Sequence, residues 1–271
     1  MKYTTLIFDL DGTLAPSKAP PSGSMCQNLC EALKHFKIAV ISGASFEQFQ
    51  KQLVAYLPCN DFSNLMLAPT NGSAIYSFKD GKWNCLEKSV LSKEDKDKIF
   101  EVIEGAMKEC HVIKNNTYGE QIEDRETQIT FSGCGSRAPI SVKEIWDPDN
   151  SLRIKMANYI KQQIPQFEVR VGGMTSIDVT AKGFDKASAT NKIEKYLNVK
   201  REEILFMGDA LFAGGNDEPE KSTGVDTLQV SGPNQTEKEI KELIEIDTLR
   251  IVDPSEAEER IKDLILQAKN I

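Results

Sequence analysis

Apolar and polar positions follow two regular patterns in the first eighty residues. Short runs of apolar, β-branched or aromatic residues are typical of strands buried on both faces, and three of them occur, at 3–8, 38–41 and 65–68. Between them, residues 25–36 place apolar side chains at helical spacing, and Ser45-x-x-Gln48 has the form of a capping box that opens a second helix. Strands that alternate with helices predict a parallel sheet covered by helices.

The pattern changes near residue 82. A long amphipathic segment at 92–110 predicts a helix. The segments that follow predict another helix at 151–164 and strands at 128–131, 167–171 and 176–180. This mixture differs from the strand–helix alternation before it, and it indicates an inserted α+β domain.

At residue 184 the alternation resumes with a helix and a short buried strand at 204–207. Two further strands are expected at 227–230 and 249–252. Capping boxes are expected to open the last two helices, at Thr236-x-x-Glu239 and Ser255-x-x-Glu258.

The predicted fold class is therefore α/β, with a Rossmann-like core whose parallel sheet is built from both ends of the chain. This core is expected at 1–81 and 184–271, and the inserted α+β cap domain at 82–183. A chain of 271 residues is long enough to bury a substantial core in such an arrangement.

Composition narrows the class of partner. The 41 acidic residues exceed the 33 basic ones, which argues weakly against a nucleic-acid surface. No apolar stretch reaches membrane-spanning length and no signal peptide is evident, so we expect a cytoplasmic protein without a membrane partner. The six cysteines fit no zinc spacing, and Cys26 and Cys30 are expected to pack as small apolar groups on one helix.

Charged and hydroxyl side chains stand where the predicted strands end. Asp9 and Asp11 close the first strand before Gly12, Ser42 follows the second, and Asp209 follows the strand at 204–207. The carboxyl ends of parallel strands meet at one edge of a sheet, where open α/β folds bind ligands. Lys186 opens the helix that precedes the last of these strands.

Each of these residues alone has a simple structural explanation: a turn serine, a helix-start lysine or an N-cap aspartate. Together they supply what phosphoryl transfer needs, namely a carboxylate nucleophile, a cation for the phosphoryl oxygens, carboxylates for Mg²⁺ and a proton donor. A nucleotide-binding dehydrogenase is set aside, because no G-x-G-x-x-G follows the first strand.

Four strings resemble the motifs of the haloacid dehalogenase superfamily in their usual order. They are Phe8-Asp9-Leu10-Asp11-Gly12-Thr13, Ile41-Ser42-Gly43, Gly183-Phe184-Asp185-Lys186, and Gly208-Asp209 with Asn216-Asp217. The resemblance implies that Asp9 attacks phosphorus and that Asp11 protonates the leaving oxygen. It further implies that Ser42 and Lys186 hold the phosphoryl group, with Gly43 beside them in substrate binding.

The resemblance also implies a magnesium site and a branch of the superfamily. Asp9, the backbone carbonyl of Asp11, and Asp209 are the implied Mg²⁺ ligands, and Asn216 and Asp217 close the metal site directly or through water. The place of the cap after the third strand resembles the type IIB, Cof-like branch, whose cap is of type C2B.

A closer likeness, to eukaryotic-type phosphomannomutases, reaches into the cap. It rests on the cap string from Gly172-Gly173-Met174-Thr175 to Ser176-Ile177-Asp178-Val179, on Gly183-Phe184-Asp185-Lys186, and on the core string Gly208-Asp209-Ala210-Leu211-Phe212-Ala213-Gly214-Gly215-Asn216-Asp217. It implies that Ser176, Asp178 and Arg125 bind the sugar and its distal phosphate. The family's I-G-R string appears as Cys134-Gly135-Ser136-Arg137, so Arg137 is displaced by one residue, and Lys143 stands near another expected arginine.

The leading hypothesis is a Mg²⁺-dependent phosphohydrolase or phosphotransferase that acts on a phosphorylated sugar through an aspartyl phosphate. One alternative is a phosphomannomutase, which interconverts mannose 1-phosphate and mannose 6-phosphate. Another is a non-catalytic sugar-phosphate-binding protein. The sequence leaves open which sugar is used and whether the cap pairs into a homodimer.

Overall fold

The computed structural model describes residues 2–113 and 118–269, and these divide into two compact units. The core unit contains the described residues up to Glu87 and from Asp185 onward; the inserted unit is Lys88–Phe184. The strands of the core unit are β1 (Thr5–Asp9), β2 (Lys37–Ile41), β3 (Leu65–Ala68), β4 (Ala74–Lys79), β5 (Lys82–Lys88), β10 (Ile204–Gly208) and β11 (Asp226–Gln229). Its helices are α1 (Gly23–His35), α2 (Phe46–Gln52), η1 (Val54–Tyr56), α3 (Pro69–Gly72), α7 (Lys186–Leu197), η2 (Arg201–Glu203), η3 (Glu218–Ser222), α8 (Pro233–Val252) and α9 (Pro254–Lys269).

The core unit is built on a seven-stranded sheet of order β11-β10-β1-β2-β3-β4-β5. The pairs from β11 to β3 are parallel, and β4 joins β3 in antiparallel fashion. Every residue of β1 and β10 is buried, as expected for central strands covered on both faces. The predicted α/β fold with a parallel sheet from both ends of the chain is confirmed. The ends of β1, β2, β3 and β10 therefore lie along one edge of this sheet.

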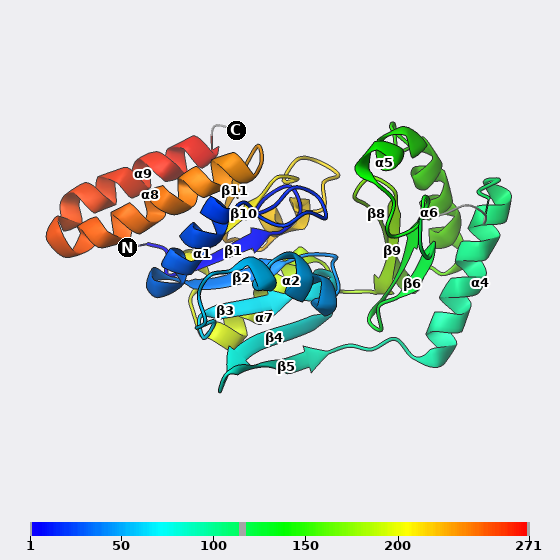
Figure 1. The fold of residues 1–271 in the computed structure, drawn as a ribbon, viewed down its shortest axis with the longest axis horizontal. Coiled ribbons are helices and arrows are strands. Elements are labelled where there is room, and N and C mark those ends of the chain that lie inside the picture. Colours follow the sequence, from blue (N-terminus) through cyan, green and yellow to red (C-terminus); the bar gives the residue numbers. More distant parts are fainter. Residues whose placement is uncertain (1, 114–117, 270–271) are drawn as a thin grey trace. The chain divides into compact units, whose positions relative to one another are not determined.

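The last two helices differ from the prediction. Residues 249–252, expected as a strand, belong to α8, because Leu249 continues the helical spacing of Ile246 and packs with it and with Ala257 and Ile261 of α9. Figure 1 shows α8 and α9 as a pair of antiparallel helices beside α1.

Neither expected capping box opens its helix. The helix α8 begins three residues before Thr236, at a proline that suits the first helical position, and the Thr236 hydroxyl donates to the Gly232 carbonyl. The start of α9 is capped by Asp253, whose Oδ1 accepts the N–H groups of Ser255 and Glu256 at 3.1 Å. Ser45 does cap α2 as predicted, since its hydroxyl accepts the Gln48 N–H.

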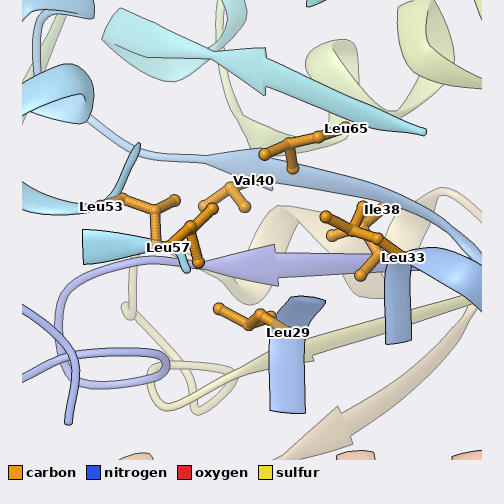
Figure 2. A pocket seen from close by; sticks show the side chains of 7 residues that line it. All are labelled: Leu29, Leu33, Ile38, Val40, Leu53, Leu57 and Leu65. Atoms are coloured by element: carbon orange, nitrogen blue, oxygen red, sulfur yellow. The ribbon is translucent and has the colours of Figure 1, made fainter. Parts of the chain in front are cut away.

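Cys30 forms a disulfide with Cys59, so the expectation that it packs as a free apolar group is wrong. The bond ties α1 to the segment after η1. Beside it, α1, β2, β3 and the α2–η1 segment enclose a small apolar cavity (Figure 2), lined by Leu29, Leu33, Ile38, Val40, Leu53, Leu57 and Leu65. A lining without polar atoms offers no partner for a phosphate or a sugar hydroxyl.

The inserted unit is a four-stranded antiparallel sheet covered on one face by helices. Its elements are α4 (Lys93–Glu109), β6 (Ile122–Asp124), β7 (Gln128–Ser132), α5 (Ile140–Trp146), α6 (Ser151–Gln163), β8 (Phe167–Gly172) and β9 (Ser176–Ala181). The strand order is β6-β7-β9-β8, and α4 and α6 pack on the sheet around a core that includes Ile129, Phe131 and Val179 (Figure 1).

The start of this unit lies later than the sequence pattern suggested. The strand β5, which begins at residue 82, belongs to the sheet of the core unit. No helix within the described ranges is long and apolar enough to cross a bilayer.

Candidate active site

Three charged residues meet in the interior of the core unit. Asp9 ends β1 and Lys186 begins α7, and they are 3% and 1% exposed. The Lys186 ammonium donates to Asp9 Oδ1 at 2.5 Å and also to Asp217 Oδ1. Both carboxylates are thereby paired with a buried cation, which compensates part of the cost of burying charge.

The start of α7 fixes the position of Lys186. The Asp185 carboxylate accepts the Ser188 N–H at 2.8 Å, and the Ser188 hydroxyl accepts the Asp185 N–H at 2.9 Å. This capping box satisfies two backbone donors at the start of the helix. Lys186 is consequently held at the first helical position, directly after the cap.

A group of three carboxylates surrounds the same point. One oxygen from each of Asp9, Asp209 and Asp217 lies within 4.8 Å of the others. The Ala210 N–H donates to Asp217 Oδ2 at 2.9 Å, and Thr13 Oγ1 donates to Asp209 Oδ1 at 3.3 Å. Carboxylates this close repel one another, and oxygen donors are what hard divalent cations prefer, so this donor set fits such a cation.

Gly12 allows this close approach. Its φ is +92°, and a Cβ at this position would lie 2.6 Å from Asp209 Oδ2. A side chain would therefore be excluded both by the backbone conformation and by the neighbouring carboxylate. The turn at Gly12 thus lets the first and fourth motifs, which follow the paired strands β1 and β10, approach each other closely.

Burial controls the proton affinities of the group. Burial raises the pKa of Asp9 to about 7, against the opposing charge of Lys186. Burial alone would lower the pKa of Lys186, but the carboxylates of Asp9 and Asp217 outweigh it, so its pKa lies above the ordinary value. Burial raises the pKa of Asp209, and Asp217 adds to the rise. A bound cation would thus compete with protons for these oxygens.

Asp11 lies outside the carboxylate group and is held by a different set of contacts. Its Oδ1 accepts the Lys18 N–H at 2.6 Å and the Gln52 side-chain amide at 3.0 Å. Gln52, at the end of α2, is only 6% exposed. The sequence interpretation missed Gln52, and its only signal was a polar residue one helical turn after Gln48.

Ser42 and Gly43 follow β2. The Ser42 hydroxyl is buried and accepts the Ala44 N–H at 3.1 Å, and its own proton has no acceptor within residues 2–113 and 118–269. The backbone N–H groups of Thr70 and Asn71 donate to the carbonyls of Ala44 and Ser42. Both Thr70 and Asn71 have positive φ, 49° and 54°, a strained conformation that is frequent beside functional sites.

Asn216 and Asp217, neighbours in the fourth motif, lie in different surroundings. Asp217 is fully buried and touches Lys186, whereas Asn216 is exposed on the loop between β10 and η3. Asp217 thus joins the carboxylate group directly.

In the inserted unit, strand alternation places Ser176 and Asp178 on the sheet face opposite the helices. Their neighbours Ile177 and Val179 point into the helix-covered core. Asp178 Oδ1 accepts the Thr130 hydroxyl at 2.8 Å across the β7–β9 pair. This surface, which includes Thr130, Ser176 and Asp178, is called the polar sheet face below.

The three expected cap cations lie in different surroundings. Arg125 follows β6 and donates to Glu123 Oε2 at 2.9 Å. Arg137 is exposed in the loop after β7, and its backbone N–H donates to the Tyr118 carbonyl. Lys143 is buried on α5.

Two arginines that the sequence interpretation did not single out contact the β8–β9 hairpin. Arg170 of β8 pairs in register with Asp178 and lies 3.6 Å from Glu168, Nε to Oε1. Arg153 of α6 is 1% exposed, and its guanidinium donates to the carbonyls of Gly172 and Gly173 at 3.1 and 2.6 Å. Arg153 therefore fixes the β8–β9 turn, which carries the glycines of the cap string.

Known proteins resemble the chain over nearly its whole length. The profile of the family described as eukaryotic phosphomannomutase matches residues 25–246. A phosphomannomutase of Saccharomyces cerevisiae is 27% identical and covers 90% of this chain and 95% of its own. A probable phosphomannomutase of Caenorhabditis elegans is 26% identical, with 89% and 96% covered.

Solved structures share the fold at lower identity. A haloacid dehalogenase-like hydrolase from Bacteroides thetaiotaomicron has a TM-score of 0.61 at 16% identity, over 89% of this chain and 99% of its own. An N-terminally truncated IMP-nucleotidase of Plasmodium falciparum has a TM-score of 0.65 at 20% identity, over 88% and 69%. The chain belongs to the eukaryotic phosphomannomutase family, and it is an enzyme, a phosphatase or hexose phosphomutase.

Proposed function

We propose that the chain is a Mg²⁺-dependent phosphomannomutase, which moves a phosphoryl group between the 1- and 6-hydroxyls of mannose by way of Asp9. The observation that carries the proposal is the meeting of Asp9, Lys186, Asp209 and Asp217 around one point in a chain of this family. That arrangement has a nucleophile, a cation and a carboxylate group with metal-binding chemistry within contact of one another.

In the first step an Asp9 oxygen attacks phosphorus. The bond from phosphorus to the sugar oxygen breaks, its electron pair stays on that oxygen, and Asp11 gives the oxygen a proton. In the second step the free hydroxyl of a mannose monophosphate attacks the phosphorus held on Asp9 and gives its proton to Asp11, so that the sugar then carries two phosphates, either of which can return to Asp9. The electron pair of the broken bond returns to the Asp9 carboxylate, which is then ready for another cycle.

Asp9, Asp209 and Asp217 would hold Mg²⁺, and the Asp11 carbonyl and Asn216 are further expected contributors. When bound, the ion neutralises negative charge, so that a carboxylate can approach a phosphate. Lys186 holds the phosphoryl group as a point charge, and the Ser42 hydroxyl donates its unused proton to a phosphoryl oxygen, with Gly43 lining the same turn.

The polar sheet face is proposed to bind the rest of the sugar phosphate. Ser176 and Asp178 supply a hydroxyl and a carboxylate for sugar hydroxyls, and Arg125 supplies a cation for the second phosphate. Arg137 and Lys143 are weaker candidates for the same task, since one is exposed in a loop and the other is buried on α5.

A direct test is to incubate the protein with mannose 1-phosphate, Mg²⁺ and a hexose bisphosphate activator and to follow the phosphorus signals by NMR. We expect mannose 6-phosphate to accumulate. If neither the isomer nor free phosphate appears with any hexose or pentose phosphate, the proposal is wrong.

A second candidate, sugar-phosphate hydrolysis, is favoured by one observation. Ser136 stands where the family string carries its arginine, and the adjacent Arg137 is exposed. Weaker capture of a second phosphate would let water replace the sugar hydroxyl as the acceptor. Release of free phosphate without the isomer would support this candidate.

A further inference from the structure

Gln52 connects three parts of the core unit through one buried amide. Its Nε2 donates to Asp11 Oδ1 and to the Ala19 carbonyl, both at 3.0 Å. Its Oε1 accepts the side-chain amide of Gln48 at 3.1 Å. Both N–H groups of the amide are thus used, one on the Asp11 carboxylate and one on the backbone of the turn after it.

The Ala19 carbonyl determines which end of the Gln52 amide faces Asp11. A carbonyl can only accept, so the Gln52 nitrogen points at Ala19 and Asp11, and its oxygen is left to accept from Gln48. Both acceptors require a donor, and the three hydrogen bonds are mutually consistent in this orientation only.

The two oxygens of Asp11 therefore differ. Oδ1 accepts from Gln52 and from the Lys18 N–H at 2.6 Å, while no donor reaches Oδ2 from any residue that the structure describes. An oxygen that already accepts two N–H groups has little capacity to carry a proton as well. The proton of the neutral carboxyl belongs on Oδ2.

We propose that Gln52 is a positioning residue for Asp11: it keeps Oδ1 as a hydrogen-bond acceptor, so that Oδ2 gives up and takes back the proton in phosphoryl transfer. This inference rests on the proposed function of Asp11. The attachment of the same amide to Ala19 also holds the turn that supplies the Lys18 N–H, so one side chain maintains both contacts to Oδ1.

Two phosphate esters separate this role from a general structural one. The esters are mannose 1-phosphate and p-nitrophenyl phosphate. The leaving oxygen of mannose 1-phosphate needs a proton, whereas the p-nitrophenolate of the second ester leaves without one. We expect Gln52→Ala to slow turnover of mannose 1-phosphate about 10–100-fold, because a positioned acid or base contributes about 10²–10⁴-fold. The first-turnover burst of nitrophenolate should change less than threefold. An equal loss on both esters would overturn the proposal.

Gln52→Glu gives a second readout that retains the size of the side chain. A glutamate carboxylate has no N–H to donate to Asp11 Oδ1 or to the Ala19 carbonyl, so turnover of mannose 1-phosphate should fall as it does in Gln52→Ala. Wild-type turnover in Gln52→Glu would contradict the positioning role. Lys51→Gln, an exposed neighbour on the same helix, is the matched control and should retain wild-type kinetics.

A double-mutant cycle then tests whether Gln52 acts through Asp11. In an Asp11→Asn background, Gln52→Ala should have no further effect on kcat, whereas independent roles would multiply the two losses. Thermal unfolding of each variant identifies a loss of fold. If the wild-type protein transfers no phosphoryl group, the proposed function itself fails; a normal wild type with multiplying losses refutes only the role of Gln52.

Discussion

The two units hold their charges in different ways. In the core unit, Asp9, Lys186 and Asp217 are buried together, and each depends on the others for compensation of its charge. In the inserted unit, Arg125 and Arg170 are partly exposed, and each contacts a glutamate two residues away on its own strand segment. A single substitution should therefore disable the core site, whereas a single substitution on the polar sheet face should only adjust binding.

Lys186→Met should have the largest effect. It leaves the carboxylates of Asp9 and Asp217 buried without their cation, which typically costs about 3–5 kcal/mol of folding stability. It should also lower kcat by about 10³-fold or more, because the phosphoryl group loses its point charge. Denaturant unfolding and a phosphate-release assay measure the two effects. Lys195→Met, exposed on the same helix, serves as control, and normal activity of the Lys186 variant would contradict the account.

Removing the Cys30–Cys59 disulfide tests stability without touching the charged group. The bond closes a segment with a sequence separation of 29 residues, so Cys30→Ser should reduce the free energy of unfolding by about 3 kcal/mol. Activity at 25 °C should be retained, since no active-site contact is lost. Cys85→Ser, exposed and free, is the control. Equal unfolding midpoints with and without reductant would show that the bond does not stabilise the core unit.

Glu220 offers a pH-dependent test of burial in the core unit. It is fully buried and accepts the Thr190 hydroxyl at 2.9 Å, and burial raises its pKa to about 8. Between about pH 5 and 8 the folded protein keeps a proton that the unfolded chain loses, so stability falls as pH rises. Glu220→Gln removes this dependence and should raise the free energy of unfolding by about 2 kcal/mol at pH 6.

At pH 4 the Glu220→Gln variant should nearly match the wild type, because the glutamate is then mostly protonated in both states. Thermal unfolding of both proteins from pH 4 to 8 gives the comparison. Parallel curves would mean that Glu220 is ionised in the folded protein.

The smallest effect is expected on the polar sheet face. Arg170 is adjacent to Asp178 in the sheet, so Arg170→Ala should raise KM for a hexose phosphate about fivefold and leave kcat within about twofold. Lys155→Ala, exposed on α6, is the control. A loss in kcat as large as that of Lys186→Met would remove the contrast between the two units.

The sequence predicted the residues whose positions follow from topology. Asp9, Ser42 and Asp209 each follow a buried strand, and parallel strands bring their carboxyl ends to one edge. Gln52 and Glu220 could not be found in this way, because tertiary packing decides whether a polar residue in a short helix is buried.

Tertiary contacts also explain the other differences between the predicted and the observed structure. Nothing in the spacing of six cysteines indicates that Cys30 pairs with Cys59, and Cys26 one helical turn away suggested ordinary helix packing. The run at 249–252 satisfies a strand pattern and a helix pattern equally, and its contact with α9 selects the helix. In the inserted unit the resemblance to the family string singled out Arg137 as a substrate-binding residue. The register of β8 and β9 instead places Arg170 beside Asp178.

The central claim is that the phosphoryl group passes through Asp9. Quenching the protein in acid during turnover of a hexose phosphate and treating it with borohydride would convert an aspartyl phosphate into homoserine, which peptide mass spectrometry can locate. We predict homoserine at position 9 and unmodified aspartate at positions 11, 209 and 217. Turnover without homoserine at position 9, or with homoserine at another position, would contradict the account.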